Sequence, residues 1–441
     1  MFNNSFKIKY IVNMKLLKGT ILSFINNPFS VTVNDSVKLI EFGGVLIDGQ
    51  FIKKVDKFSV LHSQYPYAEI YNYGTNIITS GFIDCHMHYP QTGIIASYGK
   101  RLLDWLNEYT FPEEKKFNDI TYARKIASLT LDLCIKNGTT TLASFCTTSV
   151  NSVDAIFDHA QKRNMCVIAG KTCMDRNAPE YLTDSAKSAY DESKRLIKRW
   201  HNNNRAYYAI TPRFAPTSSP EQLECLGSLW SEYPDCLMQT HLSEQKEEIE
   251  WVKKLFPKSK NYLDVYDKFN LVKKNSIFGH CIHLKEAEIE MLRGRKSSIA
   301  HCPTSNTFIG SGIFKMKELT SKKINVGLAT DTGGGTSFSM LKTIAETYKI
   351  SQLNNFSLHP AQLFWLATVG SAKALNLENQ IGNIKEGFYA DLNILNLSST
   401  KEIEQRCKRA KNFWEELFPT LIMGDDRAIQ SSWVSGNEIV L

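Results

Sequence analysis

The stretch Ile78-Thr79-Ser80-Gly81-Phe82-Ile83-Asp84-Cys85-His86-Met87-His88 is an apolar run that ends in two histidines one residue apart. In a β-strand the side chains alternate between the two faces, so His86 and His88 point the same way. Two imidazoles on one side of a rigid strand supply half of a metal site. Because a single His-x-His pair does not define such a site, the other ligands must come from elsewhere in the chain.

Length and composition bound the class of protein. A chain of 441 residues predicts one large domain of roughly 250 to 300 residues and a smaller one. The net charge of +7 comes from 52 basic and 45 acidic residues that are scattered along the chain, which favours a solvated surface over nucleic-acid binding. The ten cysteines lack paired spacing and indicate reduced thiols. No secretory signal and no membrane span of about 18 apolar residues is present, so we expect a soluble cytoplasmic protein without nucleic-acid or membrane partners.

Strand patterns occupy both ends of the chain. Val45–Ile47 and Phe51–Val55 flank Asp48-Gly49, which is a strong hairpin signal. Near the C-terminus, the runs Ala390–Leu395 and Trp433-Val434 also have the composition of strands. The simplest topology brings the two ends together. We therefore predict a flexible N-terminal extension over 1–14, a small β-sandwich-like domain built from 15–76 and 385–441, and a large domain over 77–384.

Within the large domain, short apolar runs alternate with amphipathic helical patterns such as Tyr122–Ile135. Eight runs have the length and composition of buried strands: 78–85, 140–145, 166–173, 206–214, 236–241, 277–281, 298–302 and 325–331. Eight strands with intervening helices predict an α/β fold of the closed (β/α)₈ TIM-barrel type. A doubly wound open sheet is the alternative, but no Gly-x-Gly-x-x-Gly follows any of these strands.

Side chains of metal-ligand type stand at the C-terminal ends of several predicted strands. Active sites of (β/α)₈ barrels lie at those ends, where residues from different strands converge. The residues concerned are His86, His88, His241, His280 and Asp331. Their convergence predicts a metal centre at the mouth of the barrel. His301 also ends a strand, but no motif gives it a role.

These residues and their neighbours form motifs. Gly81 to His88, His241-Leu242-Ser243-Glu244, His280 and Ala329-Thr330-Asp331 together resemble the amidohydrolase superfamily of metal-dependent hydrolases. A second set of motifs resembles, more narrowly, the guanine deaminase family: His88-Tyr89-Pro90-Gln91, Leu103-Asp104-Trp105-Leu106, Tyr109-Thr110-Phe111-Pro112, Thr211-Pro212-Arg213-Phe214 and His301-Cys302-Pro303-Thr304-Ser305-Asn306. The resemblance runs from about Lys15 to the C-terminus.

The resemblance implies one Zn²⁺ per chain, held by His86, His88, His241 and Asp331, with a position left for water. An ion held in this way lowers the pKa of its water from about 16 to about 7. Asp331 is implied to accept the proton of that water. His280 is implied to orient and stabilise the nucleophile, and whether it also binds the metal stays open.

Glu244 resembles the proton shuttle of the family, because a buried carboxylate near the reacting atoms can carry protons. The alternative is that it belongs to an exposed helix start together with Glu247, Glu248 and Glu250. We expect those three glutamates at the surface.

On this resemblance, substrate recognition falls to Gln91, Arg213 and Phe214. Arg213 offers a planar donor fork for O6 and N7 of guanine. Phe214 offers a ring face for stacking, worth about 1 to 3 kcal/mol, and Gln91 can both donate and accept. Because neighbouring strand residues face opposite ways, Arg213 and Phe214 can line one pocket only if the chain leaves the strand there.

The activity implied is conversion of guanine and water into xanthine and ammonia by a homodimer. Two alternatives remain: the same chemistry on cytosine, a pterin or a triazine, and an inactive relative serving as a scaffold. The signature of the other zinc deaminase fold is absent, which argues against editing of nucleic acids. Arg213 stands where two-metal members have a modified lysine, so one metal is expected; Lys171 is the only in-strand lysine that could alter this.

Overall fold

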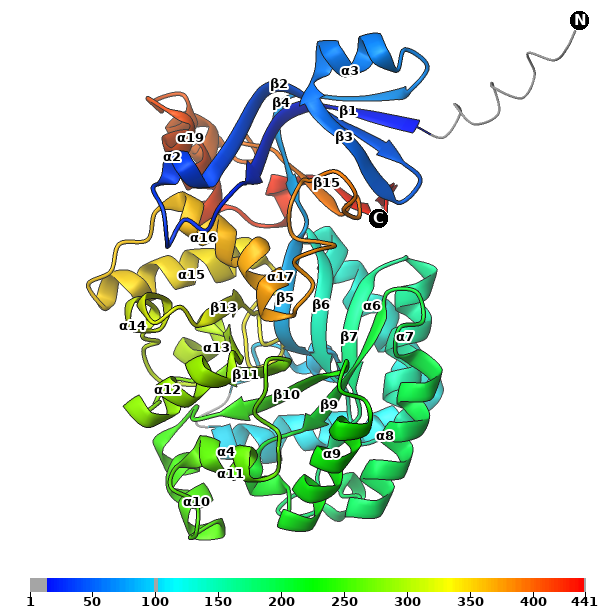
Figure 1. Ribbon diagram of the computed structural model, residues 1–441, viewed down its shortest axis with the longest axis vertical. Helices are drawn as coiled ribbons and strands as arrows, with labels where there is room; N and C mark the ends of the chain where they lie inside the picture. Colours follow the sequence, from blue (N-terminus) through cyan, green and yellow to red (C-terminus); the bar gives the residue numbers. More distant parts are fainter. Residues whose placement is uncertain (1–13, 99–101, 440–441) are drawn as a thin grey trace, which may run out of the picture.

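The computed structural model describes residues 14–98 and 102–439. Two sheets organise these residues, one of nine strands and one of seven. Figure 1 shows the seven-stranded sheet at the top and the larger sheet with its helices below. Of the predicted extension over 1–14, only Met14 lies within the described residues, where it begins strand β1.

Eight parallel strands of the larger sheet form the predicted barrel. In spatial order they are β5 (Phe82–His88), β6 (Thr139–Phe145), β7 (Cys166–Gly170), β9 (Ala206–Pro212), β10 (Leu237–Leu242), β11 (Ser276–His280), β12 (Ser298–His301) and β13 (Asn325–Leu328). The short β8 (Thr172–Cys173) pairs only with β9. Past β13, the Asp331 N–H donates to the His86 carbonyl at 2.9 Å, and the His88 N–H donates to the Thr332 carbonyl at 2.5 Å. These bonds bring the last strand against the first, so the (β/α)₈ prediction is confirmed.

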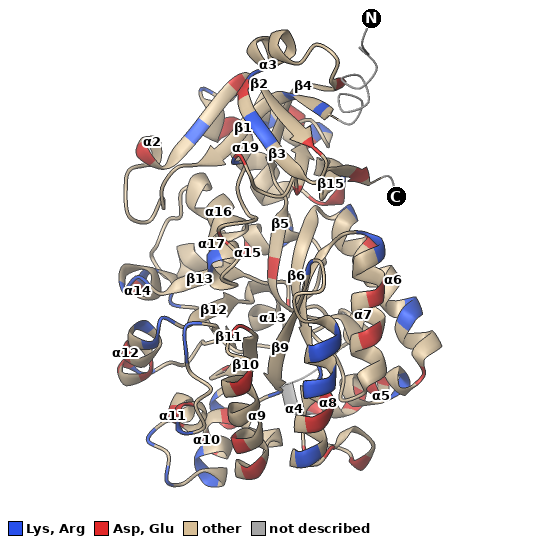
Figure 2. Cartoon of the chain, turned by 45° about the vertical axis from the view of Figure 1, so that its right-hand side comes forward, with Lys and Arg blue, Asp and Glu red and all other residues tan. Residues whose placement is uncertain are grey.

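Helices surround the barrel (Figure 1). In chain order they are α6 (Ile120–Lys136), α7 (Val150–Lys162), α8 (Ala186–Trp200), α9 (Pro220–Glu232), α10 (Lys246–Leu255), α11 (Tyr262–Lys268), α12 (Glu286–Arg295), α13 (Pro303–Phe308), α14 (Met316–Ser321), α15 (Met340–Leu353), α16 (Pro360–Leu366) and α17 (Val369–Ala374). The side chains of Asp119, Ser185 and Ser219 accept bonds from the first turns of α6, α8 and α9, which satisfies backbone donors at the helix starts. Figure 2 shows charges of both signs on the outward face of α8, opposite its buried residues.

Shorter helical segments connect these elements. Several lie between β5 and α6: η1 (Tyr89–Ile94), α4 (Leu102–Trp105), the π-helical turn η2 (Leu106–Thr110), α5 (Phe111–Lys115) and η3 (Lys116–Asn118). Others lie elsewhere: α2 (Val33–Ser36), α3 (Phe58–Gln64), η4 (Glu180–Leu182), η5 (Ala215–Thr217), α18 (Lys401–Cys407), α19 (Phe413–Met423) and η6 (Asp426–Ala428).

Both chain ends build the seven-stranded sheet. Its order is β16 (Asn437–Ile439), β15 (Ile429–Val434), β14 (Leu392–Leu395), β4 (Glu69–Ser80), β1 (Met14–Phe24), β2 (Val37–Asp48) and β3 (Phe51–Lys57). All neighbours are antiparallel except β1 and β4. Ile52 in β3 exchanges backbone bonds of 2.8 Å with Gly387 and Phe388, just before β14. The sheet therefore curls until its two ends share one apolar core, as in a sandwich, with Val45 from β2 and Trp433 from β15.

The stretch over 78–88, from which the barrel is predicted, belongs to two strands rather than one. β4 ends at Ser80 in the small sheet, and β5 begins at Phe82 in the barrel. Gly81 lies between them, where a Cβ atom would come within 2.2 Å of the Thr140 hydroxyl. The strand predicted over 78–85 thus crosses from one sheet to the other, and β4 runs past the boundary predicted at 76. The division into 15–76, 77–384 and 385–441 stays a prediction.

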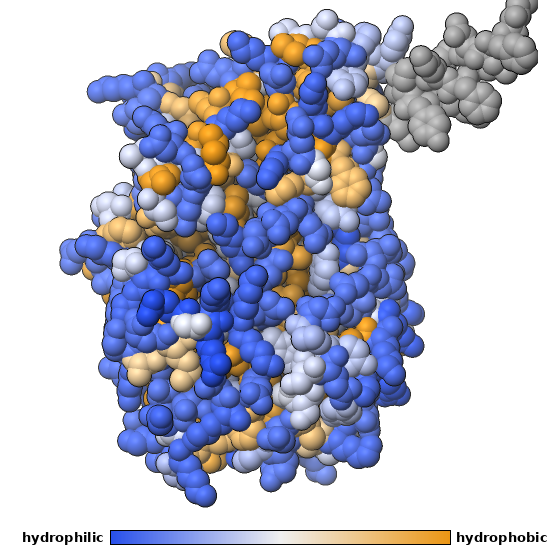
Figure 3. Space-filling model, in the orientation of Figure 1, coloured by the Kyte–Doolittle hydropathy of each residue, from blue (hydrophilic) through white to orange (hydrophobic). Residues whose placement is uncertain are grey.

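The surface differs between the two parts. Figure 3 shows apolar side chains gathered in the upper part of one face, where the seven-stranded sheet lies, and mainly hydrophilic residues below. Exposed large apolar residues of the small sheet include Leu39, Phe42, Phe51 and Ile70. Among the described residues, no helix combines the length and apolarity needed to cross a membrane. All ten cysteines fall within the described ranges and are free thiols.

Candidate active site

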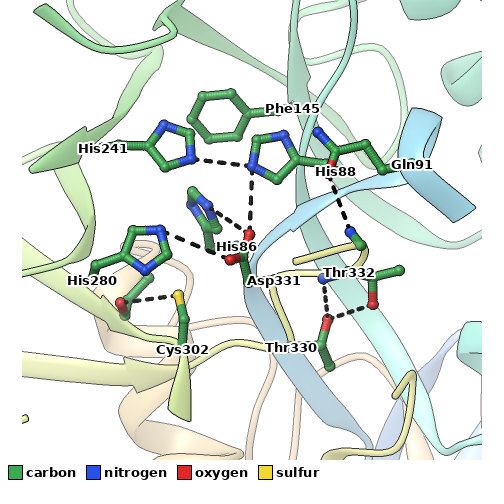
Figure 4. Close-up of polar contacts among 12 residues, drawn as sticks. His86, His88, Gln91, Phe145, His241, His280, Cys302, Thr330, Asp331 and Thr332 are labelled. Carbon is green, nitrogen blue, oxygen red and sulfur yellow. Dashed lines mark hydrogen bonds and ion pairs between the residues drawn. The ribbon is translucent and has the colours of Figure 1, made fainter. Parts of the chain in front are cut away.

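Five side chains converge at the C-terminal end of the barrel (Figure 4). His86 and His88 lie in β5, His241 in β10, and His280 is the last residue of β11. Asp331 follows β13. The His88 and His241 Nε2 atoms are 3.1 Å apart, and Asp331 Oδ1 lies 3.4 Å from His86 Nε2 and 3.5 Å from His88 Nε2. The structure therefore brings together all five residues that the sequence places at one mouth.

These separations fit a tetrahedral metal site. Zinc–nitrogen bonds of about 2.0 to 2.1 Å put neighbouring ligand atoms about 3.3 Å apart, and the distances above are 3.1 to 3.5 Å. The ligand atoms of His86, His241, His280 and Asp331 also lie within 4.8 Å of one another. The buried His86 Nε2 has no hydrogen-bond partner in the described chain. A cation among these atoms would satisfy them.

Neighbouring groups hold the imidazoles in the form that binds metal. The His241 Nδ1–H donates to the Arg213 carbonyl at 2.7 Å, which leaves Nε2 free as a ligand. Burial lowers the pKa values of His86, His88 and His241, so the neutral, metal-binding form dominates. The ring of Phe145 lies 4.7 to 4.9 Å from these three imidazoles and supplies the apolar wall.

The backbone is strained where the strands reach this mouth. Ser243, His280, Cys281 and Asp331 have φ values of 51°, 69°, 54° and 49°, in the left-handed region that side chains disfavour. Such conformations cost about 1 to 3 kcal/mol each and persist only where the surroundings impose them. Here they turn the chain where the strands end, and the side chains of His280 and Asp331 line the pocket at the mouth.

Asp84 is a supporting residue that the sequence analysis did not single out. One of its carboxylate oxygens accepts from the Thr330 N–H at 3.0 Å and the His86 N–H at 3.2 Å, and the other accepts from the Thr330 hydroxyl. Burial raises its pKa to about 7. Asp84 thus joins β5, which carries His86, to the segment before Asp331. Its signal in the sequence is a lone carboxylate inside an apolar run.

Glu244 lies beside this centre, in the loop between β10 and α10. One carboxylate oxygen accepts from the Ser311 hydroxyl at 2.8 Å, and the other lies 3.5 Å from His280 Nε2. Burial raises the pKa of Glu244. The His280 Nδ1–H donates to Asn306 at 2.9 Å, which orients its Nε2 toward Glu244 and Asp331. A proton can therefore pass between groups in this corner of the site.

The expectation that Glu248 lies at the surface is wrong. Its carboxylate is buried, accepts from the backbone N–H groups of Glu244 and Gln245 at 2.9 and 3.1 Å, and accepts from the Tyr262 hydroxyl at 2.7 Å. Glu248 therefore fixes the loop that carries Glu244. Glu247 and Glu250 are exposed, as expected.

A pocket of about 430 Å³, open mouth included, lies over the ligand cluster. It is lined by His88, Gln91, Trp105, Leu106, Arg213, Phe214, His241, Glu244, His280, Ile309, Asp331 and Gly334. β9 ends at Pro212, so the next two residues leave the strand and both reach the pocket. The volume suits a small organic ligand.

Glu114 is a second residue that the sequence analysis missed. Its buried carboxylate accepts from Arg213 Nη1 at 2.9 and 3.0 Å and from Gln91 Nε2 at 3.0 Å. It follows the Tyr109-Thr110-Phe111-Pro112 motif, which is the only signal in the sequence that points to it.

Comparison with known proteins fits this geometry. Residues 77–439 match the model of the Amidohydrolase family. The chain belongs to the amidohydrolase family. Among the relatives of this amidohydrolase is the guanine deaminase of Escherichia coli strain K12, which is 43% identical and covers 96% of this chain and 97% of its own length.

Solved structures of guanine deaminases are also similar to this chain. The structure of E. coli guanine deaminase has a TM-score of 0.94 and 43% identity, and the match covers 97% of this chain and 99% of that one. A guanine deaminase from C. acetobutylicum with bound guanine in its active site has a TM-score of 0.88 and 32% identity, with 97% and 100% covered. The resemblance to guanine deaminases predicted from the motifs is confirmed.

The other lysine and histidine residues considered for the site of this amidohydrolase lie outside the ligand cluster. Lys171 is buried and paired with Asp184, so it is engaged away from the histidines. His301 ends β12 but stacks on Phe314, with ring centroids 4.1 Å apart. His283 is half-buried and donates to the Ser311 carbonyl.

Proposed function

We propose that this amidohydrolase is a guanine deaminase, which hydrolyses guanine to xanthine and ammonia with one zinc ion per chain. The observation that carries the proposal is the pocket itself, because it joins a cluster of metal-ligand atoms to buried donors at Arg213 and Gln91. Its relatives with 31 to 43% identity over nearly the whole chain include proteins named guanine deaminase. A structural match at 32% identity contains guanine.

His86, His88, His241 and Asp331 would hold the ion. The separations of 3.1 to 3.5 Å among their ligand atoms and the unpartnered His86 Nε2 support this set. The ion, when bound, acidifies water and makes a nucleophile available at neutral pH. His280 lies farther from Asp331, at 3.8 Å from Oδ2, and is better placed to orient that water than to complete the set.

Recognition rests on three side chains that line the pocket. Arg213 offers donors to O6 and N7 of guanine in one plane. Gln91 offers an amide to the N3 edge. Phe214 supplies a ring face at the end of β9, beside Arg213. Together they favour a flat purine with an acceptor at position 6.

Two carboxylates move the protons of the reaction. Asp331 takes the proton of the water that attacks carbon 2, and Glu244 protonates ring nitrogen 3. The proton held by Asp331 then passes to the amine, the bond between carbon 2 and the amine nitrogen breaks, and the hydroxyl proton on carbon 2 returns to Glu244, so that ammonia leaves and xanthine remains. Burial raises the pKa of Glu244, which suits a group that must both give and take a proton near neutral pH.

The proposal is tested by incubating purified, metal-analysed protein with guanine and following xanthine by absorbance together with the ammonia released. We expect turnover, about one zinc per chain, and loss of activity with a chelator. Adenine, cytosine, a pterin and a chlorinated triazine are run beside it. If the protein leaves guanine unchanged but deaminates one of the other rings, that amino-heterocycle becomes the assigned substrate. Loss of every activity with metal bound would refute deamination.

We also propose a cytoplasmic homodimer, as the family resemblance implies. Size measurement in solution and fractionation of cells test these two points, which stay predictions.

A further inference from the structure

We propose that Glu114 is the positioning residue that makes the pocket selective for a 6-oxo purine, by fixing both Arg213 and Gln91. The inference rests on the proposed deamination of guanine. The carboxylate of Glu114, in α5, is fully buried and bridges Gln91 in η1 and Arg213, which directly follows β9. It accepts from Arg213 Nη1 at 2.9 and 3.0 Å and from Gln91 Nε2 at 3.0 Å.

Glu114 first fixes the guanidinium of Arg213. A buried guanidinium is costly without a counter-ion, and Glu114 supplies it. Only Nη1 of Arg213 is used in this pair; within the described residues, Nε and Nη2 make no hydrogen bond. Because the guanidinium is planar, holding one nitrogen sets the direction of the remaining donors. Arg213 lines the pocket, so these donors are the ones available to an acceptor on the ligand.

Glu114 also fixes which way the Gln91 amide faces. An ionised carboxylate only accepts, so Gln91 must turn its NH₂ group toward Glu114. Its oxygen then accepts from the Gly333 N–H at 3.4 Å (Figure 4). With this orientation imposed, Gln91 keeps one N–H and one lone pair for the ligand. One charge thus determines the donor and acceptor pattern of the whole recognition edge.

The neighbour Glu113 provides a matched control. It is also buried, but its partners are Lys116, at 2.6 Å, and Tyr122, and it does not line the pocket. Glu114→Gln keeps the size of the side chain but replaces one acceptor oxygen by an NH₂ group. Arg213 Nη1 contacts both oxygens of Glu114, so it meets this donor whichever way the amide faces, and Arg213 must turn. Glu114→Asp keeps the charge and shortens the reach. Glu113→Gln makes the same replacement of a buried carboxylate by an amide, one residue away.

The test compares guanine with 2-aminopurine, which carries the same amine but lacks the 6-oxo group. We expect Glu114→Gln to lower kcat/KM for guanine by about 10- to 100-fold, mainly through KM, the range expected for lost charge-assisted hydrogen bonds. The value for 2-aminopurine, or its inhibition constant where it binds without turnover, should change by a smaller factor than the value for guanine, because 2-aminopurine keeps N7 and the N3 edge but has no O6 contact to lose. Glu114→Asp should fall between, and Glu113→Gln should keep the wild-type ratio.

The zinc content of the variants distinguishes a positioning role of Glu114 from a general loss of structure in the site. The Arg213 carbonyl accepts from the His241 Nδ1–H, so a collapse of this region would also disturb a metal ligand. We expect Glu114→Gln to bind as much zinc as the wild type. A wild-type substrate ratio in both Glu114 variants would overturn the inference, as would an equal loss with both substrates or the same shift in Glu113→Gln. If the wild-type protein leaves guanine unchanged, the proposed function fails instead.

Discussion

Glu244→Gln is the substitution that most directly tests the proton path. The two side chains have the same shape, and an amide oxygen can still accept from the Ser311 hydroxyl, now at 2.8 Å from Oε1. The oxygen that lies 3.5 Å from His280 Nε2 becomes an NH₂ group, which can donate to that nitrogen. The pocket should therefore keep its form while losing the only function that an amide cannot perform, which is proton transfer.

The expected loss of activity in Glu244→Gln follows from the loss of proton transfer alone. General acid–base catalysis contributes about 10²- to 10⁴-fold, or about 2.7 to 5.5 kcal/mol of barrier. We expect kcat for guanine to fall by this factor, with KM changed little because Glu244 does not belong to the recognition edge. Zinc content should match the wild type, since the proposed ligand set does not include Glu244. The assay is xanthine formation at saturating guanine, with metal analysis of the same samples.

Ser311→Ala provides the graded control. It leaves the carboxylate of Glu244 in place and removes one hydrogen bond to it, so we expect a loss of roughly tenfold, the worth of one bond to a charged group. The ranking of the two variants is the decisive result. A Glu244→Gln protein that keeps metal and more than a tenth of wild-type kcat would refute the proton-transfer role, and so would a larger loss in Ser311→Ala.

Three further predictions concern the metal and the substrate. His86→Ala and His241→Ala should each lose bound zinc and activity together, because each removes a ligand; retained zinc with near-normal turnover would contradict the proposed set. Removal of zinc by a chelator should lower the melting temperature measured by calorimetry, since an ion that binds only the folded chain at 100 times its Kd stabilises it by about 2.7 kcal/mol; an unchanged melting temperature in the metal-free protein would speak against the centre. Adenine should be slower than guanine by about 10⁴-fold in kcat/KM, because its 6-amino group would face the donors of Arg213; similar rates in the same assay would remove Arg213 from recognition.

The barrel could be predicted from sequence because its strands are buried on both sides and read as apolar runs. The convergence of the candidate site residues could also be predicted, since strand ends of such a barrel converge and His86, His241 and His280 stand at those ends. The division at Gly81 could not be predicted, because β4 and β5 are both apolar where they meet and the pattern does not change when the chain crosses between sheets.

The supporting carboxylates were missed for a different reason. Glu248 lies among other glutamates at the start of a helix, and Glu114 follows a proline and another glutamate, so both have the local pattern of exposed first-turn residues. Their burial comes from distant segments, since Tyr262 contacts Glu248 while Arg213 contacts Glu114. Only the three-dimensional fold brings these donors to the carboxylates.

Arg213 links the proposed recognition edge to the proposed metal centre through two different parts of one residue. Its guanidinium pairs with Glu114 in the pocket, while its carbonyl accepts from the His241 Nδ1–H and fixes the form of that proposed ligand. Because the carbonyl belongs to the backbone just after β9, changes to the side chain leave this second bond in place. The selectivity of the pocket can therefore vary by substitution at Glu114 or Gln91 without loss of the metal site, whereas a shift of the backbone at Arg213 would disturb both.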